Sequence, residues 1–438
     1  MNNYQMIHPA TALTGDVCIP GDKSISHRTV MLAGLADQPV QVNNFLLADD
    51  CCSTIACMQA LGVEIRRLDD SSIIIKGNGL HGLKEPYNIL DAGNSGTTIR
   101  LLTGILAAQP FISIVTGDES LRQRPMGRVI TPLTKMGANI RGRDNDRFAP
   151  LAVLPVSDLA GIEYNMSVAS AQVKSAILLA GLFAKSPTTL IEPVQSRDHT
   201  ELMMEAFGVK LQRNHNSVTL YPPAGLQAPT SFDVPGDISS AAFWLVAASV
   251  IPGSSLVLRN VGVNPSRTGI IDVLIGMGAD IRLLNERLSG KEPVADIAVN
   301  YSQLRGIRIE GEIIPRLVDE IPILTVASLA AEGTTIIRGA GELRVKETDR
   351  LTAVTAEFSK MGAVIQESRD GLEIAGKQLL SFALCDSYHD HRIAMTMAVA
   401  GAFGQGAQII SADCVRISYP DFFEELNRLA CCVGGRAS

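Results

Sequence analysis

Apolar segments of about a dozen residues recur along the chain, and each opens with polar residues. They begin near Ser24, Ser95, Ser170, Ser239, Asp319 and Asp390. The segments are apolar on nearly all sides, which is typical of helices buried in a core and not of amphipathic surface helices. Ser and Asp at their starts are common N-cap residues. The pattern therefore predicts six buried helices in the 438 residues.

A second pattern places a glycine between a large apolar residue and a small one. The five copies centre on Gly62, Gly137, Gly208, Gly278 and Gly362, and neighbouring copies lie 70 to 84 residues apart. Each copy ends a helical pattern and precedes an alternating, strand-like stretch, where glycine suits the left-handed residue that closes a helix. The spacing matches that of the six helices, so the chain is predicted to contain six α/β repeats.

The two halves of the chain resemble each other. Pro20-Gly21-Asp22 recurs as Pro235-Gly236-Asp237, 215 residues later. We therefore expect an α/β fold of two similar domains, each with three repeats. One domain is predicted to span residues 21–235, and the other residues 1–20 plus 236–438. The chain would cross between them twice, near Pro20-Gly21 and near Pro235-Gly236.

Composition limits the class of protein. Hydrophobic residues make up 46% and charged residues 19%, which excludes a disordered chain. A net charge of −7 disfavours a nucleic-acid binder with a broad basic face, although it allows a small cationic pocket. The longest apolar runs reach half a membrane span, and the first twelve residues lack a secretory signal, so we expect a cytoplasmic protein. Eight cysteines without metal-ligand spacing predict no metal site.

The predicted helix starts also carry the candidate chemistry. Helix N-termini expose N–H groups and a partial positive charge, so several of them in one cleft would bind anions. The stretch 94–98 is either an ordinary N-cap or a site for a phosphate or carboxylate, because Gly96 lets a ligand approach the backbone, and Arg124 suits the same anions. Asp319 is either a general base or only an N-cap. The charged stretch 344–350 is either a solvated helix face or a site at a loop-to-helix junction.

Six motifs, taken together, resemble the 3-phosphoshikimate 1-carboxyvinyltransferase (EPSP synthase) family. They are Pro20–Arg28, Asn94–Arg100, Arg124–Gly127, Ser170–Gln172, Arg344–Arg350 and Asp390–Arg392. The motifs occur in the same order as in the family, and together they extend over nearly the whole chain. The resemblance implies two domains, each of three βαβαββ repeats with buried parallel helices, an inside-out α/β barrel.

The resemblance also implies an activity. The enzyme would transfer the carboxyvinyl group of phosphoenolpyruvate to the 5-hydroxyl of shikimate-3-phosphate and release phosphate. The reaction would proceed by addition and elimination through a tetrahedral intermediate, as a step of chorismate and aromatic amino acid biosynthesis. These two small molecules would be its only partners, with no nucleic acid, no membrane, no metal and no organic cofactor. We expect a monomer whose two domains close on the substrates.

The family pattern assigns roles to individual residues. The expected contacts of shikimate-3-phosphate are Lys23, Ser24, Arg28, Ser170, Gln172, Arg197, Asp319 and Lys346. The expected contacts of phosphoenolpyruvate are Lys23, Gly96, Arg124, Gln172, Arg350 and Arg392. Asp319 is the expected base for the 5-hydroxyl proton, and Glu347 the expected acid that protonates the methylene carbon. Lys23 would stabilise charge, and the division of the proton transfers among these three residues stays open.

Some positions depart from one well-known branch of the family. Ile417 occupies the place of a Lys that contacts phosphoenolpyruvate there, so this contact is absent or is replaced by Arg416. Glu342 replaces an Asn. With Arg197, these features resemble the second bacterial branch, which often tolerates the herbicide glyphosate. Gly96 leaves room for that inhibitor, so the degree of tolerance stays open.

Two alternative functions compete with this interpretation. The first is enolpyruvyl transfer to a UDP-amino sugar, but that related family usually uses a loop Cys as its acid. The loop that contains Arg122 and Arg124 has no Cys. The second is a non-catalytic repeat protein that binds anions, which would not need Asp319 and Glu347 together.

Overall fold

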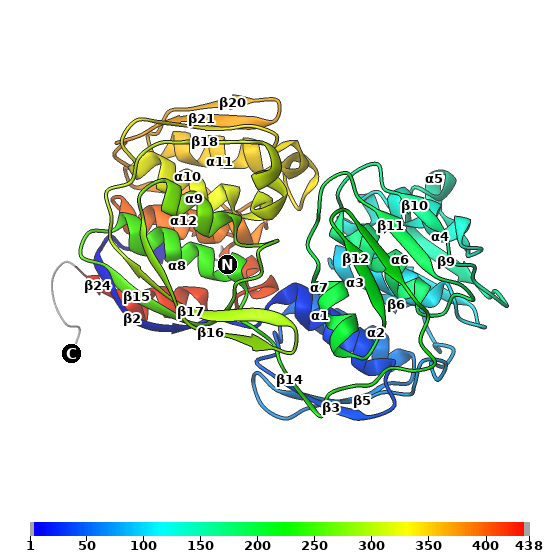
Figure 1. Cartoon of the computed structure of the whole chain (residues 1–438). Coiled ribbons are helices and arrows are strands. Elements are labelled where there is room, and N and C mark those ends of the chain that lie inside the picture. Colours follow the sequence, from blue (N-terminus) through cyan, green and yellow to red (C-terminus); the bar gives the residue numbers. More distant parts are fainter. Residues whose placement is uncertain (1–3, 433–438) are drawn as a thin grey trace. The chain divides into compact units, whose positions relative to one another are not determined.

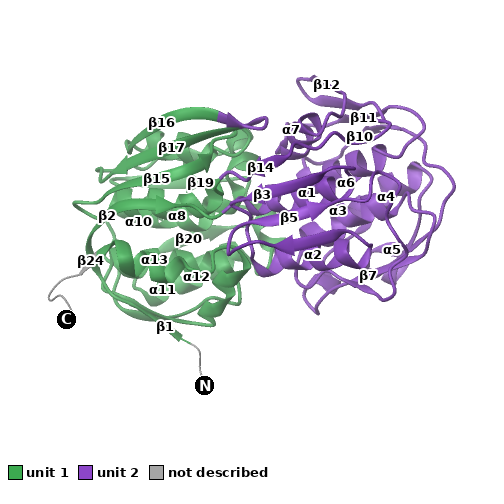
Figure 2. Cartoon of the chain, turned by 90° about the horizontal axis from the view of Figure 1, so that it is seen from below, with its two compact units in different colours: residues 1–20, 236–287, 293–438 green, residues 21–235, 288–292 purple. Residues whose placement is uncertain are grey.

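The computed structural model describes residues 4–432 and divides into two compact units. Unit 1 contains the described residues up to Pro20, then residues 236–287 and those from 293 onwards. Unit 2 contains residues 21–235 and 288–292 (Figure 2). The segment 288–292 is the tip of a hairpin whose strands belong to a sheet of unit 1, and the repeat pattern of the sequence carried no signal for it.

Unit 2 contains three four-stranded sheets. The first sheet has the strand order β14 (Ser231–Asp233), β3 (Pro39–Asn43), β5 (Ile73–Lys76) and β4 (Glu64–Arg67). The second has the order β6 (Leu90–Asp91), β7 (Ser113–Thr116), β9 (Phe148–Leu154) and β8 (Asn139–Gly142). The third has the order β10 (Glu163–Asn165), β11 (Thr188–Ile191), β13 (Ser217–Leu220) and β12 (Leu211–Asn214). In each sheet the first two strands are parallel and the remaining neighbours are antiparallel.

Six α-helices of unit 2 connect these strands. They are α1 (Lys23–Gly34), α2 (Asp49–Ala60), α3 (Gly96–Leu106), α4 (Gly127–Lys135), α6 (Ala171–Gly181) and α7 (His199–Ala206), with the short η1 (Leu121–Gln123) and α5 (Arg143–Asp146) between them. In the second sheet the order β6, α3, β7, α4, β8, β9 is a βαβαββ repeat, and the third sheet repeats it. In the first sheet the leading strand, β14, comes from the end of the unit.

Unit 1 also contains three sheets. The first has the strand order β16 (Asp280–Ser289), β17 (Glu292–Asn300), β15 (Ser255–Gly262), β2 (Ala10–Cys18) and β24 (Ala430–Cys432). The second has the order β18 (Arg308–Ile309), β19 (Thr334–Ile337), β21 (Gly371–Ala375) and β20 (Ile365–Ser368). The third has the order β1 (Tyr4–Ile7), β23 (Ala407–Ile410) and β22 (Ala383–Asp386). The order β18, α10, β19, α11, β20, β21 is again a βαβαββ repeat, so the predicted α/β repeat fold is confirmed.

The helices of unit 1 follow the same pattern (Figure 1). They are α8 (Ile238–Val250), α9 (Gly269–Gly276), α10 (Ile321–Ala330), α11 (Arg350–Lys360), α12 (His391–Phe403) and α13 (Phe422–Leu429), with the 3-10 segments η2 (Gly311–Arg316), η3 (Val318–Glu320), η4 (Gly341–Val345) and η5 (Ala412–Ile417).

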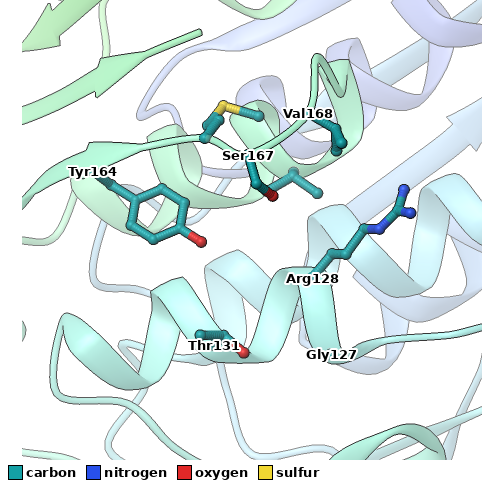
Figure 3. A pocket seen from close by; sticks show the side chains of 8 residues that line it. Gly127, Arg128, Thr131, Tyr164, Ser167 and Val168 are labelled. Carbon is teal, nitrogen blue, oxygen red and sulfur yellow. The ribbon is translucent and has the colours of Figure 1, made fainter. Parts of the chain in front are cut away.

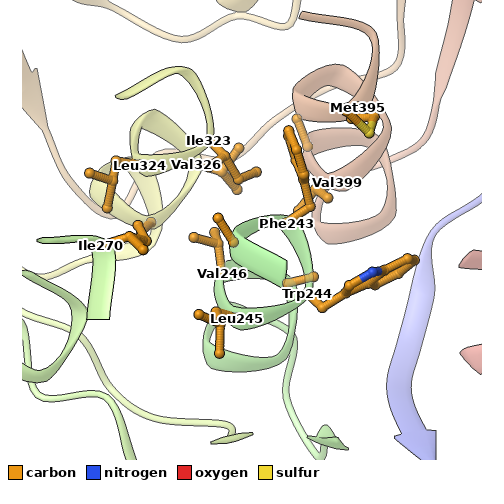
Figure 4. Close-up of a cluster of buried hydrophobic side chains, with 14 of the residues drawn as sticks. Phe243, Trp244, Leu245, Val246, Ile270, Ile323, Leu324, Val326, Met395 and Val399 are labelled. Atoms are coloured by element: carbon orange, nitrogen blue, oxygen red, sulfur yellow. The ribbon is translucent and has the colours of Figure 1, made fainter. Parts of the chain in front are cut away.

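Each unit has a core built around three of its helices. In unit 1, side chains of α8, α10 and α12 face one another, among them Phe243, Val326 and Val399 (Figure 4). All thirteen residues of α8 are buried, as the apolar sequence predicts. Each large apolar side chain buried in this way contributes about 1.5–3 kcal/mol to folding. In unit 2, α1, α3 and α6 are buried in the same manner.

The repeated glycines close helices in a left-handed conformation. Gly62, Gly137, Gly208, Gly278 and Gly362 have φ angles of 92°, 104°, 80°, 98° and 86°. Each directly follows the last turn of a helix and precedes the next strand or extended stretch. A side chain at these positions would strain the backbone, which explains why the pattern repeats.

One predicted helix start was wrong in its detail. Asp319 does not open the α-helix that follows it but lies in the 3-10 turn η3, and α10 begins at Ile321. Pro322 occupies the first turn of α10, where its missing N–H group costs no hydrogen bond. The carboxylate of Asp319 is therefore displayed from a tight turn in front of the helix.

Candidate active site

The start of α1 holds Lys23 and Ser24. Asp22 caps this helix by accepting a hydrogen bond from the Ile25 N–H at 2.9 Å. The Lys23 ammonium group lies 3.1 Å from Asp50 Oδ2 at the start of α2, and the Lys23 side chain is 18% exposed. The pairing holds the lysine at the helix end while part of its side chain stays accessible to solvent.

Arg28 lies one turn further along α1 and is buried. Its guanidinium group donates to the Ser24 carbonyl at 2.8 Å, to Thr200 Oγ1 at 2.6 Å and to Ser175 Oγ at 2.6 Å. Burial lowers the pKa of Arg28 to about 10, against the opposing effect of Asp22 and Glu201. Arg28 thus stays protonated at neutral pH and links α1 with α6 and α7. The family motif alone did not indicate this structural role.

The start of α3 presents an open backbone. Ser95 caps the helix by accepting from the Thr98 N–H at 3.1 Å, and Gly96 is its first residue. Arg124 donates to Asn94 Oδ1 at 2.7 Å. A Cβ atom at Gly96 would lie 2.7 Å from Arg100 Nη1 and 3.4 Å from Arg124 Nη1. Gly96 and two guanidinium groups therefore share a crowded space in which only a glycine fits without displacement.

The start of α6 is tied to α3. Arg100 Nη1 donates to Gln172 Oε1 at 2.8 Å, and Gln172 Nε2 donates to Thr97 Oγ1 at 3.1 Å. Ser170 is the N-cap of α6. We call Lys23, Gly96, Arg100, Arg124 and Gln172 the cationic cluster of unit 2. Gly96, Arg124 and Gln172 each lie beside Arg100 or its neighbours, and Lys23 is linked to α3 through Asp50, whose carbonyl oxygen accepts from Thr98 Oγ1 at 3.4 Å.

Arg197 lies in the loop between β11 and α7, and a buried ion-pair network holds that loop. Lys174 of α6 is 1% exposed and lies 2.8 Å from Glu192 and 2.7 Å from Glu201, while it donates to the Ser196 carbonyl at 3.3 Å. Burial raises the pKa of Glu201, although Lys174 opposes the shift. The network connects the turn that follows Ser170 and Gln172 with the loop that carries Arg197.

In unit 1, one guanidinium group is shared by three carboxylates. Arg350 is 2% exposed and lies 2.7 Å from Asp390, 2.6 Å from Glu347 and 3.3 Å from Asp319. Burial disfavours its charge, but Asp390, Glu347 and Asp319 outweigh this effect, so the pKa of Arg350 is raised. We call these four residues, with Lys346, the carboxylate cluster of unit 1.

Lys346 and Arg392 lie at the edge of this cluster. The Lys346 ammonium group is 3.5 Å from Asp319 Oδ1 and 2.8 Å from Glu342 Oε1. Arg392, the second residue of α12, donates from Nη1 to the Asp319 carbonyl oxygen at 3.1 Å. All five site residues that were predicted in unit 1 are therefore in one place. Arg416 lies in η5 and is exposed.

Comparison with known proteins identifies the family. The sequence profile of the EPSP synthase (3-phosphoshikimate 1-carboxyvinyltransferase) family matches residues 7–426. A 3-phosphoshikimate 1-carboxyvinyltransferase of Desulforudis audaxviator is 55% identical over 97% of this chain and 98% of its own length. The chain belongs to the EPSP synthase family. A Synechocystis enzyme of the same name is 53% identical over 98% of both chains.

Solved structures agree with this family. An EPSP synthase of Acinetobacter baumannii superposes with a TM-score of 0.89 at 40% identity and covers 99% of both chains. The enolpyruvyl transferase NikO of Streptomyces tendae has a TM-score of 0.79 at 17% identity, which shows the shared fold. The predicted family and the predicted enzyme class, a carboxyvinyltransferase, are confirmed.

Arg100 and Asp50 of this EPSP synthase chain contact predicted site residues but were not themselves predicted. Arg100 lies one helical turn after Gly96, so a search for charged residues on that face of α3 would have found it. Asp50 lies 27 residues from Lys23, and no spacing rule connects positions on two different helices. Contacts of the second kind depend on the tertiary fold.

A pocket of about 240 Å³ also lies in unit 2, between α4 and the segment from β10 to α6. Tyr164 and Ser167 line it from one side and Thr131 from the other (Figure 3). None of the predicted site residues lines this pocket. Among residues 4–432, no group of three or more His, Cys, Asp or Glu is arranged to hold a metal ion. No helix in the same range is long and apolar enough to cross a bilayer.

Proposed function

We propose that this chain transfers the carboxyvinyl group of phosphoenolpyruvate to the 5-hydroxyl of shikimate-3-phosphate and releases inorganic phosphate. Family membership supports the reaction. The guanidinium group of Arg350, which Asp319 and Glu347 share, supports the assignment of proton transfer to unit 1. Substrates that bear phosphates and carboxylates do not cross membranes unaided, which supports a cytoplasmic location. We further propose that the enzyme acts as a monomer.

Binding is assigned mainly to the cationic cluster of unit 2. Lys23, Arg124 and the N–H groups at the starts of α1, α3 and α6 offer charge and donors to phosphates and carboxylates. Ser24, Arg28, Ser170, Gln172 and Arg197, together with Asp319 and Lys346 of unit 1, are assigned to shikimate-3-phosphate. Gly96, Arg124, Gln172, Arg350 and Arg392 are assigned to phosphoenolpyruvate, and Lys23 to both substrates.

Proton transfer is assigned to the carboxylate cluster of unit 1. Side-chain exposure separates its three acids: Asp390 is 0% exposed, Asp319 12% and Glu347 24%. Asp390 therefore neutralises Arg350 in the interior, whereas Asp319 and Glu347 remain within reach of a ligand. A base and an acid placed on a substrate contribute about 10²–10⁴-fold each to the rate.

The assigned steps balance as follows. Asp319 takes the proton of the 5-hydroxyl group while the oxygen of that hydroxyl attacks C2 of phosphoenolpyruvate, and Glu347 delivers a proton to C3. This gives a tetrahedral adduct that bears a methyl group and the phosphate. Glu347 then removes a proton from the methyl carbon as the C–O bond to phosphate breaks, and Lys23 stabilises the charge that develops.

A phosphate-release assay tests the proposal. The purified chain should release phosphate only when both substrates are present, and shikimate-3-phosphate should yield the carboxyvinyl ether by mass spectrometry. A UDP-amino sugar as alternative acceptor serves as the control. Activity with the sugar nucleotide and none with shikimate-3-phosphate would refute the substrate assignment. Lys23→Met should abolish phosphate release, and normal turnover by this variant would refute the role of Lys23.

A further inference from the structure

Glu320 is a buried acid beside the carboxylate cluster that the proposed reaction does not use. It follows Asp319 in the turn η3, and its side chain is 0% exposed. The Ser239 hydroxyl at the start of α8 donates a hydrogen bond to Glu320 Oε1. Among residues 4–432, the other carboxylate oxygen, Oε2, has no hydrogen-bond partner. A fully buried carboxylate needs compensating charge, so its neighbours decide its role.

Two guanidinium groups approach the same oxygen of Glu320. Arg267 Nη2 lies 4.0 Å from Oε1, and Arg392 Nη1 lies 3.9 Å from it. Arg267 is 2% exposed, and two further hydrogen bonds fix its position: it donates to Ser239 Oγ at 2.7 Å and to Asp237 Oδ1 at 3.3 Å. Arg392 is 11% exposed and donates to the Asp319 carbonyl. Of the two, Arg392 is the more exposed.

We propose that Glu320 is a positioning residue for phosphoenolpyruvate binding. Its carboxylate separates two like charges and holds Arg392 in the place from which the guanidinium group meets the substrate anion. Arg267 supplies the second charge, so Glu320 stays balanced when Arg392 turns towards a ligand. This inference rests on the function proposed above, because Arg392 matters here only as a contact of phosphoenolpyruvate.

The inference depends on charge and not on shape. Glu320→Gln keeps nearly the same volume and can still accept the Ser239 hydrogen bond, but it removes the charge that offsets Arg267 and Arg392. The two guanidinium groups would then repel each other across one neutral oxygen, and Arg392, the more exposed one, would move. A displaced Arg392 would bind phosphoenolpyruvate less well. The KM for phosphoenolpyruvate should therefore rise, while the KM for shikimate-3-phosphate stays nearly unchanged.

Steady-state kinetics of Glu320→Gln, with each substrate varied in turn, test the inference. We expect the KM for phosphoenolpyruvate to rise about tenfold or more, while the KM for shikimate-3-phosphate changes less than about twofold. Glu357→Gln is the matched control. Glu357 is also a 0% exposed glutamate of unit 1, but it pairs with Lys360 and Tyr388. The control should leave both KM values unchanged.

The outcomes separate the inference from the proposed function. If the wild-type chain turns over both substrates and Glu320→Gln keeps a normal KM for phosphoenolpyruvate, the inference is wrong and the function stands. If the two KM values rise together, or rise equally in the Glu357→Gln control, Glu320 is only structural and the inference is wrong. If the wild type is inactive with both substrates, the proposed function itself fails. If Glu320→Gln does not fold, Ser239→Ala replaces it as the test, because this variant removes the hydroxyl that donates to Glu320. The KM for phosphoenolpyruvate must then rise by a smaller factor while the KM for shikimate-3-phosphate stays unchanged, and no rise would refute the inference.

Discussion

The cationic cluster of unit 2 and the carboxylate cluster of unit 1 use charge in different ways. In unit 2, Lys23 pairs with the single carboxylate of Asp50, but Arg100 and Arg124 donate to amide oxygens of Gln172 and Asn94. Such neutral acceptors orient a guanidinium group without cancelling its charge. In unit 1, Arg350 faces three carboxylates in a buried setting. The difference indicates that unit 2 is built to attract anions and unit 1 to hold acids in fixed positions.

The sharpest way to break this comparison is to neutralise the two reachable acids of unit 1. Asp319→Asn and Glu347→Gln should each lower kcat by about 10²–10⁴-fold, because each removes a proton-transfer group. Glu342→Gln is the control, since this exposed carboxylate pairs only with Lys346 among the contacts described. It should change kcat less than about threefold. Rates near that of the wild type for Asp319→Asn or Glu347→Gln would remove the assigned role.

Arg350→Met tests how strongly the carboxylate cluster depends on its cation. The substitution leaves Asp390 buried without its guanidinium partner, and unfolding free energy should fall by about 3–5 kcal/mol. Urea or thermal denaturation measures the loss. Arg344→Met is the comparison, because Arg344 also pairs with two carboxylates but at 27% exposure. It should cost about 1 kcal/mol or less. Equal losses in the two variants would contradict this account.

Gly96→Ala tests the crowding in unit 2. The added Cβ atom would lie 2.7 Å from the end of the Arg100 side chain, which must shift and disturb Arg124. We expect the KM for phosphoenolpyruvate to rise about tenfold, or about 1.4 kcal/mol, with little change in stability. Gly127→Ala is the control, because no atom lies within 4 Å of a Cβ at that position. An unchanged KM in Gly96→Ala would show that the space is looser than the distances indicate.

The smallest expected effect concerns acid stability. Burial, with help from Lys23 and Arg28, lowers the pKa of His27 well below its usual value, and the ring is 0% exposed. Below pH 6.5 the unfolded chain therefore binds a proton that the folded chain does not, and stability falls as the pH falls. The loss should be about 1 kcal/mol between pH 7 and pH 5.5. His27→Gln should flatten this dependence in urea denaturation, and an unchanged slope would contradict it.

Helix positions and repeat boundaries were accessible from the sequence because they depend on local patterns. The five glycines marked helix ends through their backbone conformation, and the polar residues before α1, α3 and α6 marked helix starts. Motifs also named the residues that meet around Arg350. The turn at Asp319 was missed, since the 3-10 segment η3 precedes α10, which begins two residues later at Ile321.

Contacts between distant elements could not be predicted in the same way. The pairing of Lys23 with Asp50, the burial of Arg28 against Ser175 and Thr200, and the position of Glu320 all require knowledge of which helices pack together. A single sequence holds no local signal for such pairs. These contacts decide which charged groups stay reachable, so the roles of the site residues were harder to assign than their places.

Strand order has a consequence for the synthesis of the chain. The first sheet of unit 2 gains its strand β14 from residues 231–233, so the three sheets of this unit are complete once residues 21–235 have left the ribosome. In unit 1, β2 pairs with β15 and β24, and β1 pairs with β23 at residues 407–410. The sheets that contain these two N-terminal strands are thus completed only near the end of synthesis. During translation β2 can pair with β15 once residues 255–262 have been made, whereas β1 stays without its partner until residues 407–410 and exposes unpaired backbone groups until then.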